Sequence, residues 1–332
     1  MSRQIASLSL DLDNQWSYMK THGDEGWESF PSYLEVVIPR VLRILDQHQL
    51  KITFFVVGQD AALESHLNVL KSVTESGHEI GNHSFHHEPW LHLYSPDELR
   101  IEFDRAEEAI LRATGERVRG FRGPGFSFSP QVIEELVRRG YEYDCSTFPT
   151  FLGPVARLYY FFTAKLSRQQ RCERKQLFGK LSEGFRPLRP YLWKHSAGSI
   201  VEIPVTTMPV FKLPIHLSYV LYLSQYSRSL ARWYFSLAVW MCRIFRVEFS
   251  LLLHPLDFLG TDDAVGLDFF PAMNRTHNWK CSIVDETLSQ LGKHFEVVPM
   301  RTHAAIARER LSKCATSTAG ACEKPLLPTG QQ

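Results

Sequence analysis

Carboxylate and imidazole side chains follow two short apolar runs of this 332-residue chain. Asp11 and Asp13 end the run at residues 5–12, and alternation along a strand places residues two apart on the same face. His83 and His87 are four residues apart, a spacing that predicts two imidazoles aligned on one helical turn. One carboxylate and two imidazoles make a three-ligand metal site with open positions for water and substrate. The sequence therefore predicts a divalent metal site.

The elements that must position these residues follow the pattern of βα units. Apolar runs rich in β-branched and aromatic residues alternate with segments of helical period, which predicts an α/β fold around a mainly parallel sheet. The predicted strands are residues 5–12, 52–57, 78–81, 118–122, 141–145, 200–205, 249–254 and 295–298. Parallel α/β barrels carry their active-site loops at the carboxyl ends of the strands, and most of the candidate residues fall there.

Helix boundaries are marked by residues that favour helix ends. Ser95 can cap a helix that has Pro96 at its first position, and Glu98 completes a capping box. Apolar spacing or similar end signals predict further helices. These are residues 33–48, 61–76 and 130–140. Their alternation with the predicted strands favours a single α/β domain.

Five motifs resemble, in order, those of the polysaccharide deacetylases, which have the NodB homology domain and form carbohydrate esterase family four. The motifs are Ser9-Leu10-Asp11-Leu12-Asp13-Asn14, His83-Ser84-Phe85-His86-His87, Phe121-Arg122-Gly123-Pro124-Gly125, Tyr143-Asp144-Cys145-Ser146 and Leu252-Leu253-His254-Pro255. The resemblance covers roughly residues 5 to 150 and 198 to 300. The histidine motif is its most specific part, and the ordered set is stronger than any single motif.

The resemblance implies a distorted (β/α) barrel with seven or eight mainly parallel strands. It also implies a divalent metal, usually zinc, held by Asp13, His83 and His87. Asp11 would then be the general base, and Arg122 would pair with it and orient it. Because the chain reads Asp-Leu-Asp where the family has adjacent aspartates, the roles of Asp11 and Asp13 could be exchanged.

Two further roles come from the same resemblance. His254 would be the general acid that protonates the leaving amine, a task suited to an imidazole near neutral pH. Asp144 matches an aspartate that helps hold the charged groups of the site in place. A bound zinc ion can lower the pKa of its water to about 7, which gives Asp11 a proton to accept.

The predicted activity is metal-dependent removal of an N-acyl group, an acetyl group by preference, from an amino sugar. The substrate would be a cell-envelope glycan or its lipid-linked precursor. The alternatives are a deformylase or another small-amide hydrolase with the same metal site, and a catalytically silent barrel that binds glycans or serves envelope assembly. The silent barrel is disfavoured because every member of the expected metal set is present.

The expected domain spans residues 1–312, and residues 313–332, rich in small and polar residues, should form a disordered tail. A long basic and aromatic insertion at residues 150–198 separates the fifth and sixth predicted strands. A helical segment at residues 215–247 carries further aromatic and basic residues.

Charge is distributed unevenly along the chain. The formal net charge is +1, yet residues 151–250 contain 15 Lys and Arg against four Glu and no Asp. This mixture favours peripheral contact with an anionic membrane, or equally a buried helix whose arginines extend along the domain edge. Nucleic-acid binding is disfavoured because no recognition motif accompanies the charge.

Cysteine usage and the amino terminus bear on the compartment. The 6 cysteines include no C-x-x-C pair, which favours a reducing environment. An acidic residue at position 11 interrupts any apolar core of a secretory signal, and no apolar run is long enough for a spanning helix. We therefore expect a cytoplasmic protein, with peripheral attachment at the inner face of the plasma membrane as the membrane-bound alternative.

Overall fold

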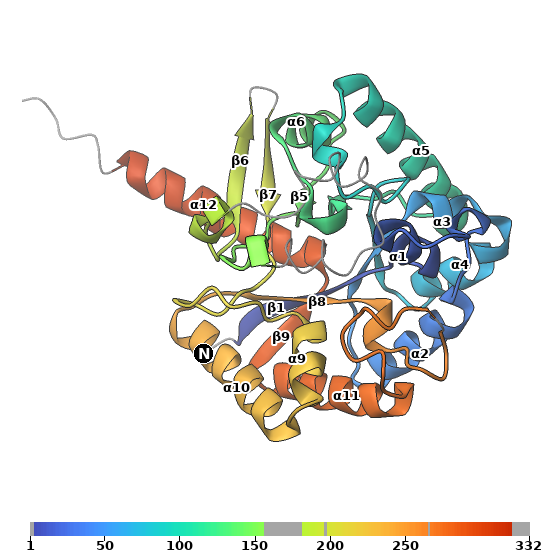
Figure 1. The fold of residues 1–332 in the computed structure, drawn as a ribbon. Helices are drawn as coiled ribbons and strands as arrows, with labels where there is room; N and C mark the ends of the chain where they lie inside the picture. The colour runs from blue at the N-terminus through green and yellow to red at the C-terminus, as the bar shows by residue number, and fades with distance from the viewer. Residues whose placement is uncertain (1–2, 156–180, 196–197, 265, 321–332) are drawn as a thin grey trace, which may run out of the picture.

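A computed structural model describes residues 3–155, 181–195, 198–264 and 266–320, with side chains described up to residue 313. Figure 1 shows helices arranged around a curved central sheet. The strands are β1 (Gln4–Asp11), β2 (Thr53–Val56), β3 (Glu79–Asn82), β4 (Gly120–Phe121), β5 (Tyr143–Asp144), β6 (Tyr191–His195), β7 (Gly198–Glu202), β8 (Phe249–Leu253) and β9 (Phe295–Val298). The helices are α1 (Gln15–His22), α2 (Leu34–Gln47), α3 (Gly58–Ala62), α4 (Leu67–Glu75), α5 (Pro96–Thr114), α6 (Pro130–Arg138), α9 (Leu217–Ser224), α10 (Arg228–Ile244), α11 (His277–His294) and α12 (Met300–Gly320).

The sheet has nine strands among the described residues, in the order β6-β7-β5-β4-β3-β2-β1-β8, with β9 paired to β1. All ladders are parallel except that between β6 and β7, which is antiparallel. The expected mainly parallel α/β fold is confirmed. Eight strands lie in parallel ladders, and β6 is an additional antiparallel strand at the end of the basic insertion, which was not predicted from its sequence.

The two ends of the parallel sheet approach each other and give it the character of a distorted barrel. Thr206, which follows β7, donates its backbone N–H to the carbonyl of Ser250 in β8 at 3.0 Å. The Ser250 N–H is donated in turn to Thr206 Oγ1 at 2.6 Å. These two hydrogen bonds close the ring without a continuous strand ladder.

Alternation along β1 separates the core from the site. Leu8 and Leu10 are fully buried in the largest apolar cluster, against the surrounding helices. Burying a leucine stabilises a fold by roughly 2 kcal/mol, so these side chains fix the register of the strand. The intervening Ser7 faces the other side, where its hydroxyl lies 2.8 Å from His303 Nδ1 of α12. Asp11 shares that face at the carboxyl end of the strand.

Helix α12 packs on the inner face of the sheet near the amino ends of the strands. It contacts β1 on one side and β7 on the other, and in Figure 1 it runs between these two parts of the ring. Its Met300 and Ala304 are buried with Phe55 and Tyr143. The helix therefore fills one end of the barrel and leaves the carboxyl end for polar residues.

The capping signals predicted several helices correctly. The Ser95 hydroxyl accepts the Glu98 N–H and the Glu98 carboxylate accepts the Ser95 N–H, which is a complete capping box at the start of α5. At the end of α6, Gly140 has a φ of +75°, the left-handed conformation in which glycine costs least. In both cases the local residue pattern determined where the helix begins or ends.

The segment predicted as helical at residues 215–247 is two helices, α9 and α10. Ser227 separates them, and its hydroxyl accepts a hydrogen bond from the Leu230 N–H to cap α10. Within the described part of the chain, every helix is too short or too polar to cross a bilayer.

The insertion and the tail are described only in part. Much of the insertion, residues 156–180, lies outside the described residues, as do residues 321–332 of the expected tail. Helix α12 extends to Gly320, eight residues into the segment for which a disordered tail was expected.

Candidate metal centre

Asp13 is positioned by the turn that follows β1. The Tyr33 hydroxyl donates a 2.6 Å hydrogen bond to the carbonyl of Asp13. Next in the chain, the Asn14 side chain caps α1 and donates a 2.7 Å hydrogen bond to the buried carboxylate of Asp60. Because both contacts hold the backbone around Asp13, the direction of its carboxylate is fixed by the fold.

His83 directly follows β3, and backbone hydrogen bonds orient both its main chain and its ring. Its backbone N–H is donated to Val56 O at 2.9 Å, which continues the ladder to β2. Its ring Nδ1 lies 2.7 Å from the carbonyl oxygen of Arg122, so this nitrogen carries the proton in the neutral imidazole. The other nitrogen, Nε2, is left with its lone pair directed into the site.

His87 reaches the same point through a loop and not through a helical turn. The expected alignment of His83 and His87 on a helix is wrong, because Ser84 and His87 have φ values of +64° and +53°. These left-handed residues turn the chain back on itself, and the Ser84 hydroxyl accepts the His87 N–H at 3.2 Å. The two imidazoles nevertheless lie close together, with ring centroids 5.1 Å apart.

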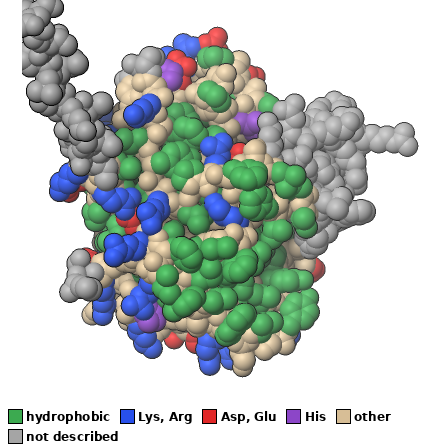
Figure 2. Space-filling model, turned by 90° about the vertical axis from the view of Figure 1, so that its left-hand side faces the viewer, with side chains coloured by type: hydrophobic (Ala, Val, Ile, Leu, Met, Phe, Trp, Pro, Cys, Tyr) green, Lys and Arg blue, Asp and Glu red, His purple; other side chains and the backbone are tan. Residues whose placement is uncertain are grey.

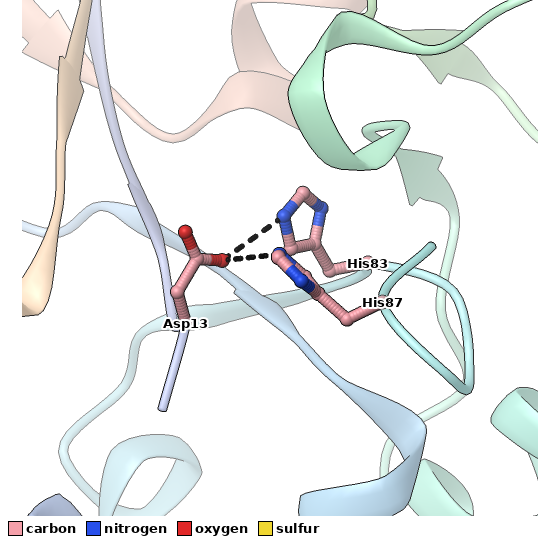
Figure 3. Close-up of side chains that lie close together, drawn as sticks. All are labelled: Asp13, His83 and His87. Carbon is pink, nitrogen blue, oxygen red and sulfur yellow. Dashed lines mark ion pairs between the residues drawn. The ribbon is translucent and has the colours of Figure 1, made fainter. Parts of the chain in front are cut away.

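The three predicted ligands converge. Figure 3 shows both imidazoles facing one carboxylate oxygen of Asp13, with distances from Oδ1 of 3.2 Å to His83 Nε2 and 2.9 Å to His87 Nε2. All three side chains are buried, and their ligand atoms lie within 4.8 Å of one another. The three residues therefore meet at one point, although the two histidines reach it through a loop.

The donor set fits a divalent cation. Asp13 Oδ1 is buried and has no hydrogen-bond partner in the described part of the protein, although two ring nitrogens lie within about 3 Å of it. A buried carboxylate oxygen and two imidazole nitrogens with converging lone pairs are ligands that zinc and similar ions bind. A cation at this point would satisfy all three atoms together.

Charge interactions within the cluster are strong. Burial disfavours the charged form of Asp13, but attraction to His87 and His83 outweighs it and holds the pKa of this carboxylate well below its ordinary value. Burial acts against protonation of His83, yet the negative charges of Asp11 and Asp13 raise its pKa. The site therefore carries negative potential that attracts either protons or a metal ion.

Asp11 and Arg122 form a second buried pair beside the first. Arg122 Nη1 donates to Asp11 Oδ1 at 3.0 Å, and the guanidinium lies over the Phe55 ring with its carbon 4.7 Å from the centroid. The other carboxylate oxygen of Asp11 lies 4.0 Å from His83 Nε2. Asp11 is thus held at the edge of the metal cluster by an arginine that is completely buried.

His254 follows β8 and belongs to a polar group of its own. Ser218 Oγ lies 3.5 Å from His254 Nδ1 and donates a 2.7 Å hydrogen bond to Asp257. Asp257 also accepts the backbone N–H of His254 at 2.8 Å. The ring centroid of His216, at the start of α9, lies 5.7 Å from that of His254. These contacts position the imidazole at the carboxyl end of its strand.

Asp144 has a different environment from the other candidates. It lies opposite Phe121 in the ladder between β4 and β5, so it shares the face of that core residue. Its Oδ1 accepts a 2.6 Å hydrogen bond from the Ser146 hydroxyl, which itself accepts the Gly123 N–H at 2.8 Å. Asp144 therefore supports the loop after Arg122 through Ser146.

A second buried carboxyl faces Asp144. Glu202 lies opposite it in the ladder between β5 and β7 and accepts hydrogen bonds from the Thr147 N–H and the Trp193 ring N–H, both at 3.0 Å. Burial and the charge of Asp144 raise the pKa of Glu202 well above its ordinary value. Burial and the neighbouring carboxylate thus favour the protonated form of Glu202, in which the repulsion between the two groups is reduced.

Tyr18 of α1 is a site residue that the sequence did not reveal. Its hydroxyl is buried and has no hydrogen-bond partner among the described residues. Burial and the nearby negative charges of Asp13 and Asp257 raise its pKa well above the ordinary value, so it stays protonated. The sequence of α1 has no apolar stripe, and a single tyrosine within it gave no signal of its place between these carboxylates.

Comparison with known proteins gives three findings. Residues 24–143 match the family model described as polysaccharide deacetylase. The peptidoglycan-N-acetylmuramic acid deacetylase PdaA of Bacillus subtilis is 36% identical over 105 residues, which are 31% of this chain and 39% of that protein. A peptidoglycan deacetylase of Helicobacter pylori is 30% identical over 154 residues, 44% of this chain and 50% of that protein.

Among solved structures, the crystal structure of a "putative polysaccharide deacetylase from Mycobacterium smegmatis" superposes with a TM-score of 0.56. The sequences are 18% identical, and the match covers 100% of this chain and 99% of the other, so it supports the fold alone. The chain spans half or less of the length of the curated relatives it matches.

Proposed function

We propose that the chain, which matches the polysaccharide deacetylase family model over residues 24–143, hydrolyses the N-acyl group, by preference an acetyl group, of an amino sugar. The single observation that carries this proposal is the convergence of Asp13, His83 and His87 on one point, with Asp11 and Arg122 beside them. An amide needs an activated nucleophile, and these residues can hold a cation and accept a proton in the same place.

In this proposal Asp13, His83 and His87 hold a divalent ion, with zinc as the preferred metal. When bound, such an ion would lower the pKa of a coordinated water and polarise an acyl carbonyl. Asp11 is the general base, because it lies beside the three metal ligands and is not one of them. Arg122 positions that base through the 3.0 Å ion pair.

The departing amine needs a proton, which the proposal assigns to His254. Its imidazole lies at a neighbouring strand end, since β8 pairs with β1, and Ser218 and Asp257 hold it from the side of α9. The backbone near Gly125 supplies a donor for the developing oxyanion. Gly125 has a φ of +58° and so turns the chain at this point.

The proposed substrate is a cell-envelope glycan or its lipid-linked precursor. The curated relatives in two bacteria are named for deacetylation of peptidoglycan, which supports an envelope sugar. The proposal places the protein at the cytoplasmic side of the membrane. Cys145, Cys242 and Cys281 are free thiols, which a reducing compartment preserves.

The proposal is tested by measuring bound metal and acyl release from an N-acetylated amino-sugar lipid for the parent and for His83→Ala. We expect one metal per chain in the parent, and loss of both metal and acetate release in the variant. His48→Ala is the matched control, because this histidine contacts Asp285 at the surface, far from the ligands in the sheet. Both variants should show the parent's circular dichroism spectrum.

Product analysis distinguishes the alternatives. Release of formate in place of acetate would assign the site to a deformylase. A parent protein that holds the metal but releases no acid from acetylated or formylated amino sugars would favour a silent glycan-binding barrel.

A further inference from the structure

A large apolar area is exposed over α9, α10 and the hairpin tip at residues 208–213, and we call it the apolar face. Figure 2 shows hydrophobic side chains gathered on one side of the molecule, with Lys and Arg side chains along the edge. The exposed fractions are 65% for Val210, 60% for Phe211, 72% for Tyr226, 61% for Trp233, 56% for Trp240 and 55% for Ile244. Patches of this kind usually mark an interaction surface.

Helix α10 shows that this exposure is not a consequence of an incomplete core. Its Phe235 and Ala238 are buried against the domain. Trp233, Trp240 and Ile244 recur at seven and four residues, so they form a stripe on a different side of the same helix. The helix has therefore already buried one apolar side, and a second apolar side remains for a partner.

The hairpin tip is held in an unusual conformation that exposes its apolar residues. Val210 has a φ of +70°, which is rare for a β-branched residue. The tip is fixed by a 2.7 Å hydrogen bond from the Met208 N–H to Leu213 O and by the Lys212 ammonium on Arg186 O at 2.7 Å. The Tyr234 hydroxyl joins α10 to the base of the tip by a hydrogen bond to Pro214 O. The tip and α10 therefore form one rigid surface.

Charge on this surface has a single sign. Residues 203–247 contain five Lys and Arg and no Asp or Glu. Arg232 pairs with Glu286 of α11 at 2.9 Å, so this arginine extends along the domain edge. Arg228 and Arg246 are exposed and have no carboxylate within ion-pair distance among the described residues. The carboxylates beside Arg228 and Arg232, those of Asp285 and Glu286, belong to α11. The apolar face itself contributes only cations, which complement an anionic lipid surface.

The apolar face is also connected to the proposed site. The tip leads within a few residues to His216, whose ring lies 5.7 Å from that of the proposed acid His254. A membrane bound at the apolar face would therefore lie beside the end of the sheet that carries the metal ligands.

We propose that α9, α10 and the hairpin tip dock the protein on an anionic phospholipid bilayer, with Phe211, Trp233 and Trp240 inserted at the headgroup level. This inference deepens the proposed function, and it rests on that function only for the lipid-linked nature of the substrate. Docking would hold the lipid tail in the membrane while the sugar reaches the site.

The test is flotation of the full chain with phosphatidylcholine vesicles, with and without phosphatidylglycerol. We expect the parent to float only with phosphatidylglycerol and to dissociate at high salt. The combined variant Phe211→Ser, Trp233→Ser and Trp240→Ser should lose at least about tenfold in binding, because apolar area sets interfacial affinity. Arg228→Glu with Arg246→Glu should weaken binding by roughly tenfold or more.

The matched control replaces three residues of similar exposure elsewhere, Val36→Ser, Ile101→Ser and Ile306→Ser, whose exposed fractions are 45%, 58% and 40%. This control should float like the parent. The docking proposal is wrong if the parent stays in the soluble fraction with anionic vesicles at low salt. It is also wrong if the triple variant binds the vesicles as the parent does. A change of oligomeric state from dimer to monomer, with vesicle binding unchanged, would likewise contradict it.

Acyl release from a water-soluble N-acetylated amino sugar, measured on the same proteins, separates this inference from the proposed function. The triple variant should keep that activity, because none of its three residues belongs to the site. Loss of membrane binding with retained hydrolysis therefore concerns the docking surface alone.

Discussion

Arg122 lies completely buried with Nη1 3.0 Å from Asp11 Oδ1, while its backbone carbonyl holds His83 Nδ1 at 2.7 Å. One residue thus positions both the proposed base and a proposed metal ligand. Its side chain and its backbone act on different partners, so a substitution of the side chain should affect the base and leave the ligand in place.

Replacing Arg122 by Met should lower kcat by about 100-fold, because Asp11 loses the partner that aligns its carboxylate. Removal of one member of a buried ion pair should also cost roughly 3 kcal/mol or more of folding free energy. The measurements are kcat, metal content and thermal unfolding. The control is Arg119→Met, whose side chain is 44% exposed and 3.9 Å from Glu142. If Arg122→Met lost bound metal as well as activity, the claim that the Arg122 side chain acts on the base and not on the metal ligands would be contradicted.

Tyr18→Phe tests the tyrosine between Asp13 and Asp257. The substitution removes a protonated hydroxyl that has no hydrogen-bond partner among the described residues and so can donate to a bound substrate. We expect kcat/KM to fall by about tenfold with metal content and stability unchanged, since one hydrogen bond to a ligand contributes roughly 1.5 kcal/mol. Tyr226→Phe, at an exposed tyrosine, is the control. Unchanged kinetics would show that Tyr18 only packs against the site.

Stability should vary with pH because of Asp60. Burial raises its pKa to about 6 from an ordinary 3.8, although hydrogen bonds from Asn14 and Trp16 oppose the shift. Between these two pH values the folded protein keeps a proton that the unfolded chain has released. The stabilising contribution of Asp60 to the free energy of unfolding is therefore fully present below pH 3.8 and is lost as pH rises through 6.

Asp60→Asn should remove this pH dependence of the free energy of unfolding, which amounts to roughly 3 kcal/mol. The new side chain keeps the oxygen that accepts from Asn14 and Trp16 at 2.7 and 2.9 Å. Denaturant unfolding from pH 4 to 7 measures the effect, with the exposed Asp46→Asn as control. An identical pH slope in the parent and in Asp60→Asn would contradict this assignment.

The fold could be predicted where local chemistry determines structure. The capping box at Ser95 and the apolar runs of the parallel strands gave the α/β pattern, because buried strands need continuous apolar sequence. Strand β6 was missed because it pairs at the sheet edge, where half-buried residues of mixed polarity leave no such run. Its pairing with β7 depends on tertiary context.

The candidate site could be predicted in part for a related reason. The ligands Asp13, His83 and His87 sit at strand ends, whose positions follow from the order of the strands. The route of the chain between the two histidines could not be predicted, because it depends on left-handed residues at Ser84 and His87. Tyr18 was missed because its helix is placed by contacts remote in the sequence.

In the proposed metal centre, one oxygen of Asp13 and one nitrogen each of His83 and His87 bind a single cation. X-ray absorption spectroscopy at the zinc edge, on protein loaded with one equivalent, tests it most directly. We expect two imidazole nitrogens and one carboxylate oxygen at about 2.0 to 2.2 Å, with one imidazole lost in His87→Ala. An unchanged spectrum in His87→Ala, or a spectrum with sulfur ligands, would contradict it.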